Sequence, residues 1–88
     1  MSEGIHSSHP AIVKRLKRAQ GHLASVLGMF EAQRSCLDLA QQLHAVESAI
    51  SSAKRELIHD HIEHCLTDTA EGGAHDSLAE LKQLAKYL

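Results

Sequence analysis

The sequence has few of the residues that mark secreted, membrane-spanning or catalytic proteins. Its 88 residues include two cysteines, one proline, one phenylalanine, one tyrosine and no tryptophan. Two cysteines cannot build the disulfide framework of a small secreted domain, and the opening MSEGIHSSH contains no apolar signal stretch. No apolar run approaches the ~20 residues that a membrane-spanning helix needs. We therefore expect one cytoplasmic domain over residues 1–88, without membrane association.

Other absences narrow the fold and argue against an enzyme. No segment alternates polar and apolar residues as a strand does, and no catalytic triad, paired acid–base carboxylates or phosphate-binding loop is visible. We predict an all-α chain of three helices without enzymatic activity. The net charge of −2 argues against a generally basic nucleic-acid binder, but it is compatible with a local basic stripe.

Apolar residues recur at helical spacing along most of the chain. The first helix is expected to follow Ser8, a candidate N-cap, with Pro10 in its first turn, and to fade near residues 33–35. Its apolar face comprises Ile12, Leu16, Ala19, Leu23, Val26, Leu27 and Phe30. Residues 1–9 are expected to form a flexible segment. A linker over residues 67–75, which contains two adjacent glycines, precedes a short last helix.

The long central helix carries a heptad seam. Its members alternate steps of four and three residues: Leu39, Leu43, Val46, Ile50, Ala53 and Leu57. Extended in both directions, the seam reaches Cys36 at one end and His61 and His64 at the other. Because one small chain cannot cover this seam, we expect two chains to pack antiparallel along it, forming a four-helix core from their first two helices.

Cys36 and the cluster His61-x-x-His64-Cys65 resemble two halves of a thiolate–imidazole metal site. In a continuous helix, a separation of 25 residues places Cys36 roughly 37 Å from His61, so the halves cannot meet within one chain. In an antiparallel pair, Cys36 would face His61 and Cys65 of the other chain, and symmetry would create two equal sites. A pair such as His61 and Cys65 also arises by chance in a chain with eight histidines. The placement of both halves at opposite ends of one seam favours metal binding.

The residue types in this set narrow the choice of metal. Two thiolates and one imidazole, from Cys36, His61 and Cys65, favour Cu(I). Ni(II), Co(II) or Zn(II) would normally require a fourth ligand. The candidates for this additional ligand are His64, His6 and His9.

Basic residues cluster on the first helix. Lys14-Arg15-x-Lys17-Arg18 places four cations within two turns, and the pair Lys54-Arg55 would extend them. A solvated helix face is the simpler interpretation, but such stripes would recur across an assembled dimer or tetramer and add phosphate contacts. The predicted DNA-contacting residues are therefore Lys14, Arg15, Lys17, Arg18, Lys54 and Arg55.

The combined pattern resembles the CsoR/RcnR family of bacterial metal-sensing repressors over residues 10–66. The residues that carry the resemblance are Arg15-Leu16-Lys17, Gly21-His22-Leu23, Cys36, Gln41-Gln42-Leu43, Ala45-Val46, Arg55, His61 and Cys65. The resemblance implies all-helical chains that assemble as dimers of antiparallel dimers, bind operator DNA when ligand-free and release it when the sensor site fills. It also implies that Cys36, His61 and Cys65 stand at the ligand positions of the copper-sensing branch, whereas nickel and cobalt sensors carry a histidine at the last position. Ser35 stands where copper sensors often have a tyrosine.

The leading functional prediction is a metal-responsive repressor whose inducer is Cu(I), with Ni(II), Co(II) or Zn(II) as alternatives. A thiol- or formaldehyde-responsive repressor, acting through Cys36, is a second possibility on the same scaffold. A metal-buffering helical protein without a DNA role is a third, from a different class, and the basic run on the first helix argues against it.

Overall fold

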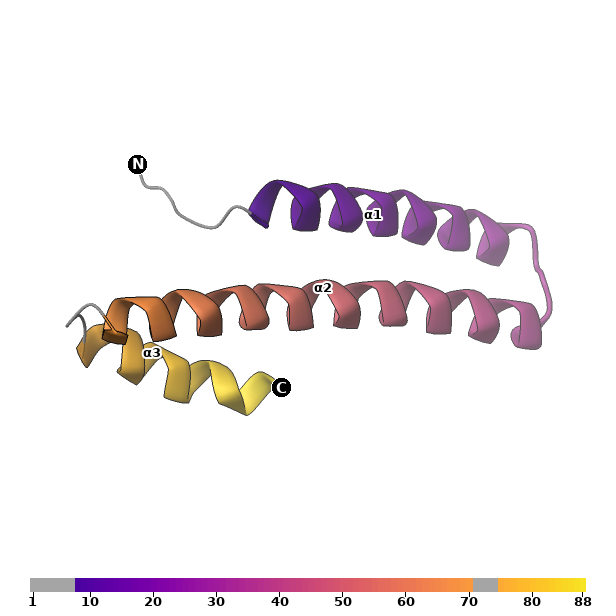
Figure 1. The fold of residues 1–88 in the computed structure, drawn as a ribbon. Coiled ribbons are helices and arrows are strands. Elements are labelled where there is room, and N and C mark those ends of the chain that lie inside the picture. Colours follow the sequence, from indigo (N-terminus) through magenta and orange to yellow (C-terminus); the bar gives the residue numbers. More distant parts are fainter. Residues whose placement is uncertain (1–7, 71–74) are drawn as a thin grey trace.

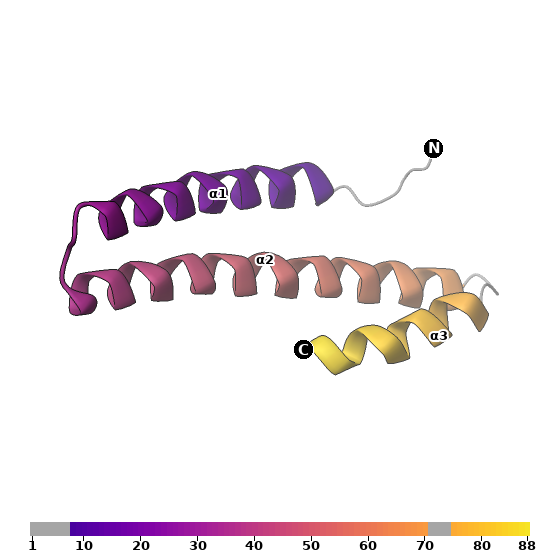
Figure 2. The ribbon, with the colours of Figure 1, turned by 180° about the vertical axis from the view of Figure 1, so that it is seen from behind.

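The computed structural model describes residues 8–70 and 75–88, with the side chains of residues 8–64 and 78–88. Regular structure in this part of the chain is entirely helical, as predicted. Helix α1 spans His9–Glu31, α2 spans Cys36–Ala70, and α3 spans His75–Leu84, followed by the short 3-10 turn η1, Ala85–Tyr87. Helices α1 and α2 lie side by side and antiparallel, and α3 folds back beside the end of α2, on the side away from α1 (Figures 1 and 2).

The molecule is long and thin, with extents of 57 × 26 × 13 Å. Its length is set by α2, because 35 residues at 1.5 Å each span about 52 Å. Helix α1 is shorter and begins beside the carboxyl-terminal half of α2 (Figure 1). None of the helices in the described ranges is both long enough and apolar enough to cross a membrane.

Helix α1 begins where the sequence predicts, but the Ser8 side chain does not cap it. The Ser8 carbonyl accepts a hydrogen bond from the Ile12 amide at 3.0 Å, while its hydroxyl makes no cap bond. Ser8 has φ −81° and ψ −16°, a helical conformation, whereas a side-chain cap requires extended backbone. Pro10 lies in the first turn, as expected. The segment predicted to be flexible, residues 1–9, ends earlier than expected, because His9 already belongs to α1. Residues 1–7 lie outside the described ranges.

The turn between α1 and α2 closes on Gln33, which adopts a left-handed conformation with φ 57°. The Arg34 amide donates to the Met29 carbonyl at 3.1 Å, and the Gln33 amide donates to the Phe30 carbonyl at 3.0 Å. These two bonds form a Schellman motif, which glycine usually closes. A side chain in this conformation costs about 1 kcal/mol, so the packing of α1 on α2 must compensate for it.

The core between α1 and α2 is a narrow stripe of residues spaced by seven. Its buried members are Ile12, Ala19 and Val26 of α1 and Leu39, Val46 and Ala53 of α2. Val26, Leu39 and Val46 form a continuous cluster, against which Met29 packs. A period of seven keeps one stripe of each helix turned toward the other, so the two helices stay in contact along the whole of α1.

One edge of this hairpin, here called the apolar edge, is covered with exposed apolar side chains. Its residues are Leu16, Leu23 and Phe30 of α1 and Leu43, Ile50 and Leu57 of α2, each between 39% and 52% exposed. The predicted apolar face of α1 and the predicted seam of α2 are therefore each divided between two surfaces. The heptad contains two neighbouring apolar stripes, and a single partner helix covers only one of them.

The opposite edge, here called the polar edge, consists of Arg15, His22, Gln42, Ala49 and Glu56. With Nε2 protonated, His22 donates to Gln42 Oε1 at 2.7 Å, and the Arg15 guanidinium lies 2.7 Å from Glu56 Oε1. Both interactions join α1 to α2. This edge therefore satisfies its polar groups within the chain.

Helix α3 packs against the far end of α2. Ile58 of α2, which is 1% exposed, and the half-buried Leu81 and Leu84 of α3 lie in this region. The predicted linker, residues 67–75, is narrower than expected, because α2 continues to Ala70 and α3 begins at His75. The helix breakers Gly72-Gly73 come only after Ala70, so nothing in the preceding residues ends α2 earlier. Residues 71–74 lie outside the described ranges.

Candidate metal centre and nucleic-acid surface

Cys36 is the first residue of α2, and a helix cap positions it. The Ser35 hydroxyl accepts a hydrogen bond from the Asp38 amide at 3.1 Å, and the Ser35 carbonyl accepts one from the Leu39 amide at 3.0 Å. Ser35 is therefore the N-cap of α2. This role was not predicted, although a serine followed three residues later by an acid is its sequence signal. The Cys36 side chain is exposed, on the same stripe of α2 as the apolar edge.

His61 lies near the other end of α2, where α3 folds back. Only 18% of its side chain is exposed, and its Nε2 lies 3.6 Å from Glu80 Oε1 of α3. At 3.6 Å this contact is longer than a hydrogen bond, so it places a carboxylate beside the imidazole without bonding to it. The position of Glu80 beside His61 was not predicted from the sequence. No local spacing signals it, because only the fold-back of α3 brings it near His61.

The remaining candidate donors occupy the same end of the molecule where they are described. His64 is half-buried on α2, and His9 is exposed at the start of α1. Cys65 belongs to α2, but its side chain lies outside the described side chains, as does the whole of His6.

The two predicted halves of the metal site do not meet within the chain. Helix α2 is unbroken from Cys36 past His61, so the expected separation of roughly 37 Å holds. Among the side chains of residues 8–64 and 78–88, no group of three His, Cys, Asp or Glu residues is close enough to hold a metal ion. Any complete site with Cys36 therefore needs donors from elsewhere.

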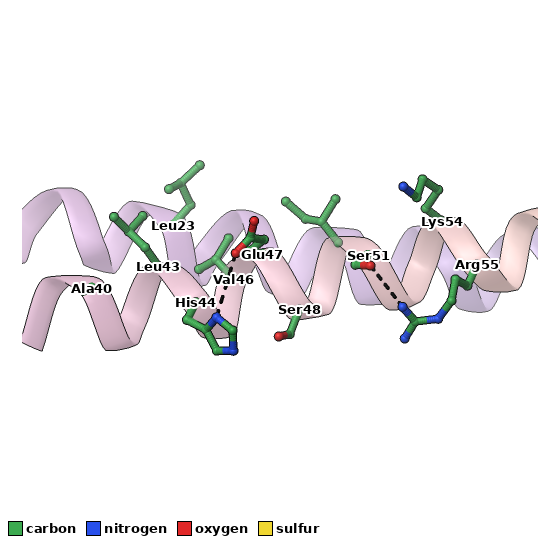
Figure 3. A pocket seen from close by; sticks show the side chains of 11 residues that line it. Leu23, Ala40, Leu43, His44, Val46, Glu47, Ser48, Ser51, Lys54 and Arg55 are labelled. Atoms are coloured by element: carbon green, nitrogen blue, oxygen red, sulfur yellow. Dashed lines mark hydrogen bonds and ion pairs between the residues drawn. The ribbon is translucent and has the colours of Figure 1, made fainter. Parts of the chain in front are cut away.

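A shallow, open groove runs along the apolar edge between the two ends of α2. Leu23 of α1 and Leu43, Val46 and Ile50 of α2 provide its apolar lining. Figure 3 shows that Lys54 lies on the same side of α2 as Leu43, whereas Arg55 is turned the other way, toward Ser51. Arg55 donates a hydrogen bond to Ser51 Oγ at 3.1 Å.

The six cations predicted to contact DNA do not lie on one face of the single chain. Arg15 and Arg18 border a small hollow on the polar edge, together with His22. Lys54 and Arg55 line the groove on the apolar edge. The other two, Lys14 and Lys17, are exposed on α1.

Comparison with known proteins assigns the chain to a family. A family model described as "Metal-sensitive transcriptional repressor" matches residues 8–87, nearly the whole chain. The chain belongs to this family, the CsoR/RcnR repressors. The resemblance drawn from the sequence is thereby confirmed, and the chain is a metal-sensing transcriptional repressor of this family. The members are classed as repressors rather than enzymes, in agreement with the prediction.

Several CsoR/RcnR relatives carry the name of a metal. The chain is 33% identical to the copper-sensing repressor CsoR of Mycobacterium ulcerans over 88 residues, which cover 99% of the chain and 75% of the relative. It is 33% identical to CsoR of Bacillus subtilis over 76 residues, covering 85% of the chain and 75% of the relative. It is 40% identical to the copper-sensing repressor RicR of Mycobacterium tuberculosis over 70 residues, covering 76% and 73%.

A solved CsoR/RcnR structure has the same fold. The nickel-responsive transcriptional regulator InrS superposes with a TM-score of 0.81 at 33% identity, covering 97% of this chain and 98% of that one. The relatives' names thus include both copper and nickel, and the donor set of this chain has to decide between them.

Proposed function

We propose that this chain is a Cu(I)-responsive repressor whose sensor site combines Cys36 of one copy with His61 and Cys65 of a second. The observation that carries the proposal is the unbroken helix α2, which bears Cys36 at its start and the other two donors near its end. A site that uses all three residues therefore requires two chains. The exposed apolar edge along the same helix supplies a surface on which the second chain would bind.

The spacing along α2 supports an antiparallel arrangement of the two copies. Cys36, Leu43, Ile50, Leu57 and His64 are each seven residues apart, with Ile50 at the middle. An antiparallel two-fold pair centred near Ile50 stacks Leu43 on the partner's Leu57 and covers the apolar edge of α2. The same register brings Cys36 beside residues 61–65 of the partner, so one arrangement serves both packing and metal binding. The proposal also includes the assembly of two such dimers into a tetramer.

The donor chemistry supports Cu(I) as the inducer. Two thiolates and one imidazole suit a soft monovalent ion that accepts three ligands. Glu80, 3.6 Å from Nε2 of His61, places a carboxylate next to this proposed imidazole ligand. The copper-sensing names of the relatives point the same way.

A Ni(II)-, Co(II)- or Zn(II)-responsive repressor is the second candidate. These ions normally take a fourth ligand, and the half-buried His64 lies one residue before Cys65. His9 and His6 are the other candidates for that position. The nickel-responsive InrS, with its TM-score of 0.81, is the observation that favours this alternative.

DNA release follows as thermodynamic linkage between the two kinds of site. The exposed cations of α1, namely Lys14, Arg15, Lys17 and Arg18, would contact operator phosphates, with Arg55 adding charge. When the sensor site is filled, the start of one α2 is held to the end of the other. If that geometry disfavours DNA binding, metal weakens DNA affinity and DNA weakens metal affinity by the same factor. A few kcal/mol of coupling is enough for derepression.

The proposal is tested by anaerobic titration of the reduced protein with Cu(I), Ni(II), Co(II) and Zn(II), while release of a fluorescent DNA fragment from the protein's own promoter is followed. We expect Cu(I) to release the DNA from the wild-type protein. Cys36→Ala and His61→Ala should keep DNA binding and lose the response, whereas His59→Ala, a substitution of an exposed histidine that does not line the groove, should retain it. Cu(I)-driven release from Cys36→Ala would contradict the shared site.

The same titration decides between the two candidate metal sets. A Cu(I) response that survives His64→Ala, His9→Ala and His6→Ala supports the three-ligand site. A response to Ni(II), Co(II) or Zn(II) that is abolished by any one of these substitutions supports the four-ligand alternative.

A further inference from the structure

Two opposite charges lie on the groove that the second copy is proposed to cover. Glu47 and Lys54 both line it and lie on the same side of α2 (Figure 3). The Glu47 side chain is 81% exposed, and its neighbour within the chain is the equally exposed His44, whose Nδ1 lies 3.9 Å away. Among the described ion pairs, none supplies Lys54 with an acidic partner. A chain seated on this groove would take both charges out of water, so each needs an opposite charge there.

The spacing of these charges matches the two-fold axis proposed for the metal site. Ala40, Glu47, Lys54 and His61 form a stripe with a period of seven, next to the stripe that contains Ile50. The midpoint between Glu47 and Lys54 falls between residues 50 and 51, where the proposed axis passes. An antiparallel partner therefore presents its Lys54 to Glu47 and its Glu47 to Lys54, which makes two equal pairs.

A parallel arrangement would have the opposite effect. A parallel two-fold pair places each residue opposite its own copy, so Glu47 would face the partner's Glu47 and Lys54 would face the partner's Lys54. Like charges placed opposite each other in an interface disfavour that partner or orientation strongly. The apolar stripe alone does not make this distinction, because Ile50 and its neighbours pack in either direction.

We propose that Glu47 of each copy forms an ion pair with Lys54 of the other, and that these two pairs fix the antiparallel register of the dimer. This inference rests on the proposed shared metal site, because the register is taken from it. The pairs act as positioning residues: they set which end of the partner lies beside Cys36, without binding the metal. Lys54 then belongs to the dimer interface rather than to the DNA-contacting surface.

Charge reversal tests the pairing directly. Glu47→Lys places two cations opposite each other at each pair, and Lys54→Glu places two carboxylates there, so each variant alone should dimerise at least about tenfold more weakly than the wild type. An equimolar mixture of Glu47→Lys and Lys54→Glu should form a heterodimer in which both pairs again join opposite charges. The double variant E47K/K54E restores both pairs, with their charges exchanged, in a homodimer. Dimerisation is measured by sedimentation equilibrium. Glu31→Lys, the same charge change outside the groove lining, is the control.

The outcomes separate this pairing from the proposed function. Weak association of both single variants, with recovery in the double variant, supports the pairing; the recovery also shows that the substituted chains fold. If the wild type is dimeric and the single variants associate as tightly as the wild type, the pairing is wrong and the shared site is unaffected. A wild type that stays monomeric overturns the shared site and the pairing together.

Discussion

Both edges of the α1–α2 hairpin repeat every seven residues, but they differ in how their side chains are satisfied. On the polar edge, Arg15 and His22 of α1 find Glu56 and Gln42 of α2, each at 2.7 Å. On the apolar edge, Leu23 and Ile50 remain 41% and 47% exposed. Polar groups with partners inside the chain need no second copy, whereas a continuous apolar stripe on a small protein marks a surface that binds something.

The same difference between the edges accounts for the positions of the proposed metal donors. Cys36 belongs to the stripe that continues the apolar edge, and His61 lies beside that stripe at its far end. Donors on the polar edge would be held in a single chain, where α2 keeps its two ends far apart. Donors on the apolar edge are completed by whatever covers that edge. Metal sensing and assembly therefore share one surface in the proposed mechanism.

The largest effect is expected from a charge at the centre of the apolar edge. Ile50→Glu would bury two unpaired carboxylates at the proposed two-fold axis, so dimerisation should weaken by at least about 100-fold. The helix itself should persist, because glutamate has a higher helix propensity than isoleucine. Sedimentation equilibrium measures the association and circular dichroism measures the helix content. Ala49→Glu, one residue away but on the polar edge, is the matched control and should dimerise normally. Equal association of both variants would break the distinction between the edges.

A smaller effect, on stability rather than assembly, is expected at the partly buried hydrogen bond of the polar edge. Gln42→Ala removes the acceptor for His22 and should lower the free energy of unfolding by about 1 kcal/mol. Urea denaturation at fixed protein concentration measures this change. Gln41→Ala, the exposed neighbouring residue, is the control and should have little effect. Loss of dimerisation in Gln42→Ala would show that the polar edge also takes part in assembly.

The exposed ion pair of the polar edge should affect DNA binding more than stability. Arg15 and Glu56 are 48% and 36% exposed, so Glu56→Gln should change the free energy of unfolding by no more than about 0.5 kcal/mol. The substitution frees Arg15 from a competing carboxylate, and operator affinity should rise about threefold at low salt and less at high salt. Fluorescence anisotropy at two salt concentrations measures this, with Glu31→Gln as the control. Unchanged affinity would argue against Arg15 as a phosphate contact.

The smallest effect is expected at the turn that both edges share. Gln33→Gly relieves the left-handed strain at φ 57°, while glycine's greater freedom in the unfolded chain offsets much of the gain, leaving a stabilisation of no more than about 0.5 kcal/mol. Gln33→Ala retains the Cβ and should not stabilise the protein. Urea denaturation compares the two variants. A gain in both would attribute the effect to the lost glutamine side chain rather than to the backbone.

Much of the fold could be predicted from spacing along the chain. Apolar residues at three- and four-residue steps identified α1 and α2, and the unbroken seam identified α2 as one long helix. The end of α1 was located near residues 33–35 without its mechanism, because a Schellman motif closed by Gln33 carries no glycine signal. Extending the linker back to Thr67 underestimated the length of α2, which continues to Ala70.

Less of the candidate site than of the fold could be predicted from the sequence. Cys36, His61 and Cys65 stood out because few residue types bind soft metals and because they end one seam. Glu80 did not stand out, since its proximity to His61 depends on how α3 folds back over α2. The division of the cations between two edges was also not predicted, because a run of basic residues does not indicate which neighbouring helix covers part of it.

By itself, the sequence determined the helices, the family and the separation of the candidate donors, because each depends on residue identity and regular spacing along one chain. Only the tertiary structure decided which of two neighbouring heptad stripes is buried. Packing α1 onto α2 covers Ala19 and Val46 and leaves Leu23 and Ile50 exposed, a choice that depends on the rotation of one helix against the other. That rotation also determines which charges, Glu47 and Lys54 among them, lie on the surface left for a second copy.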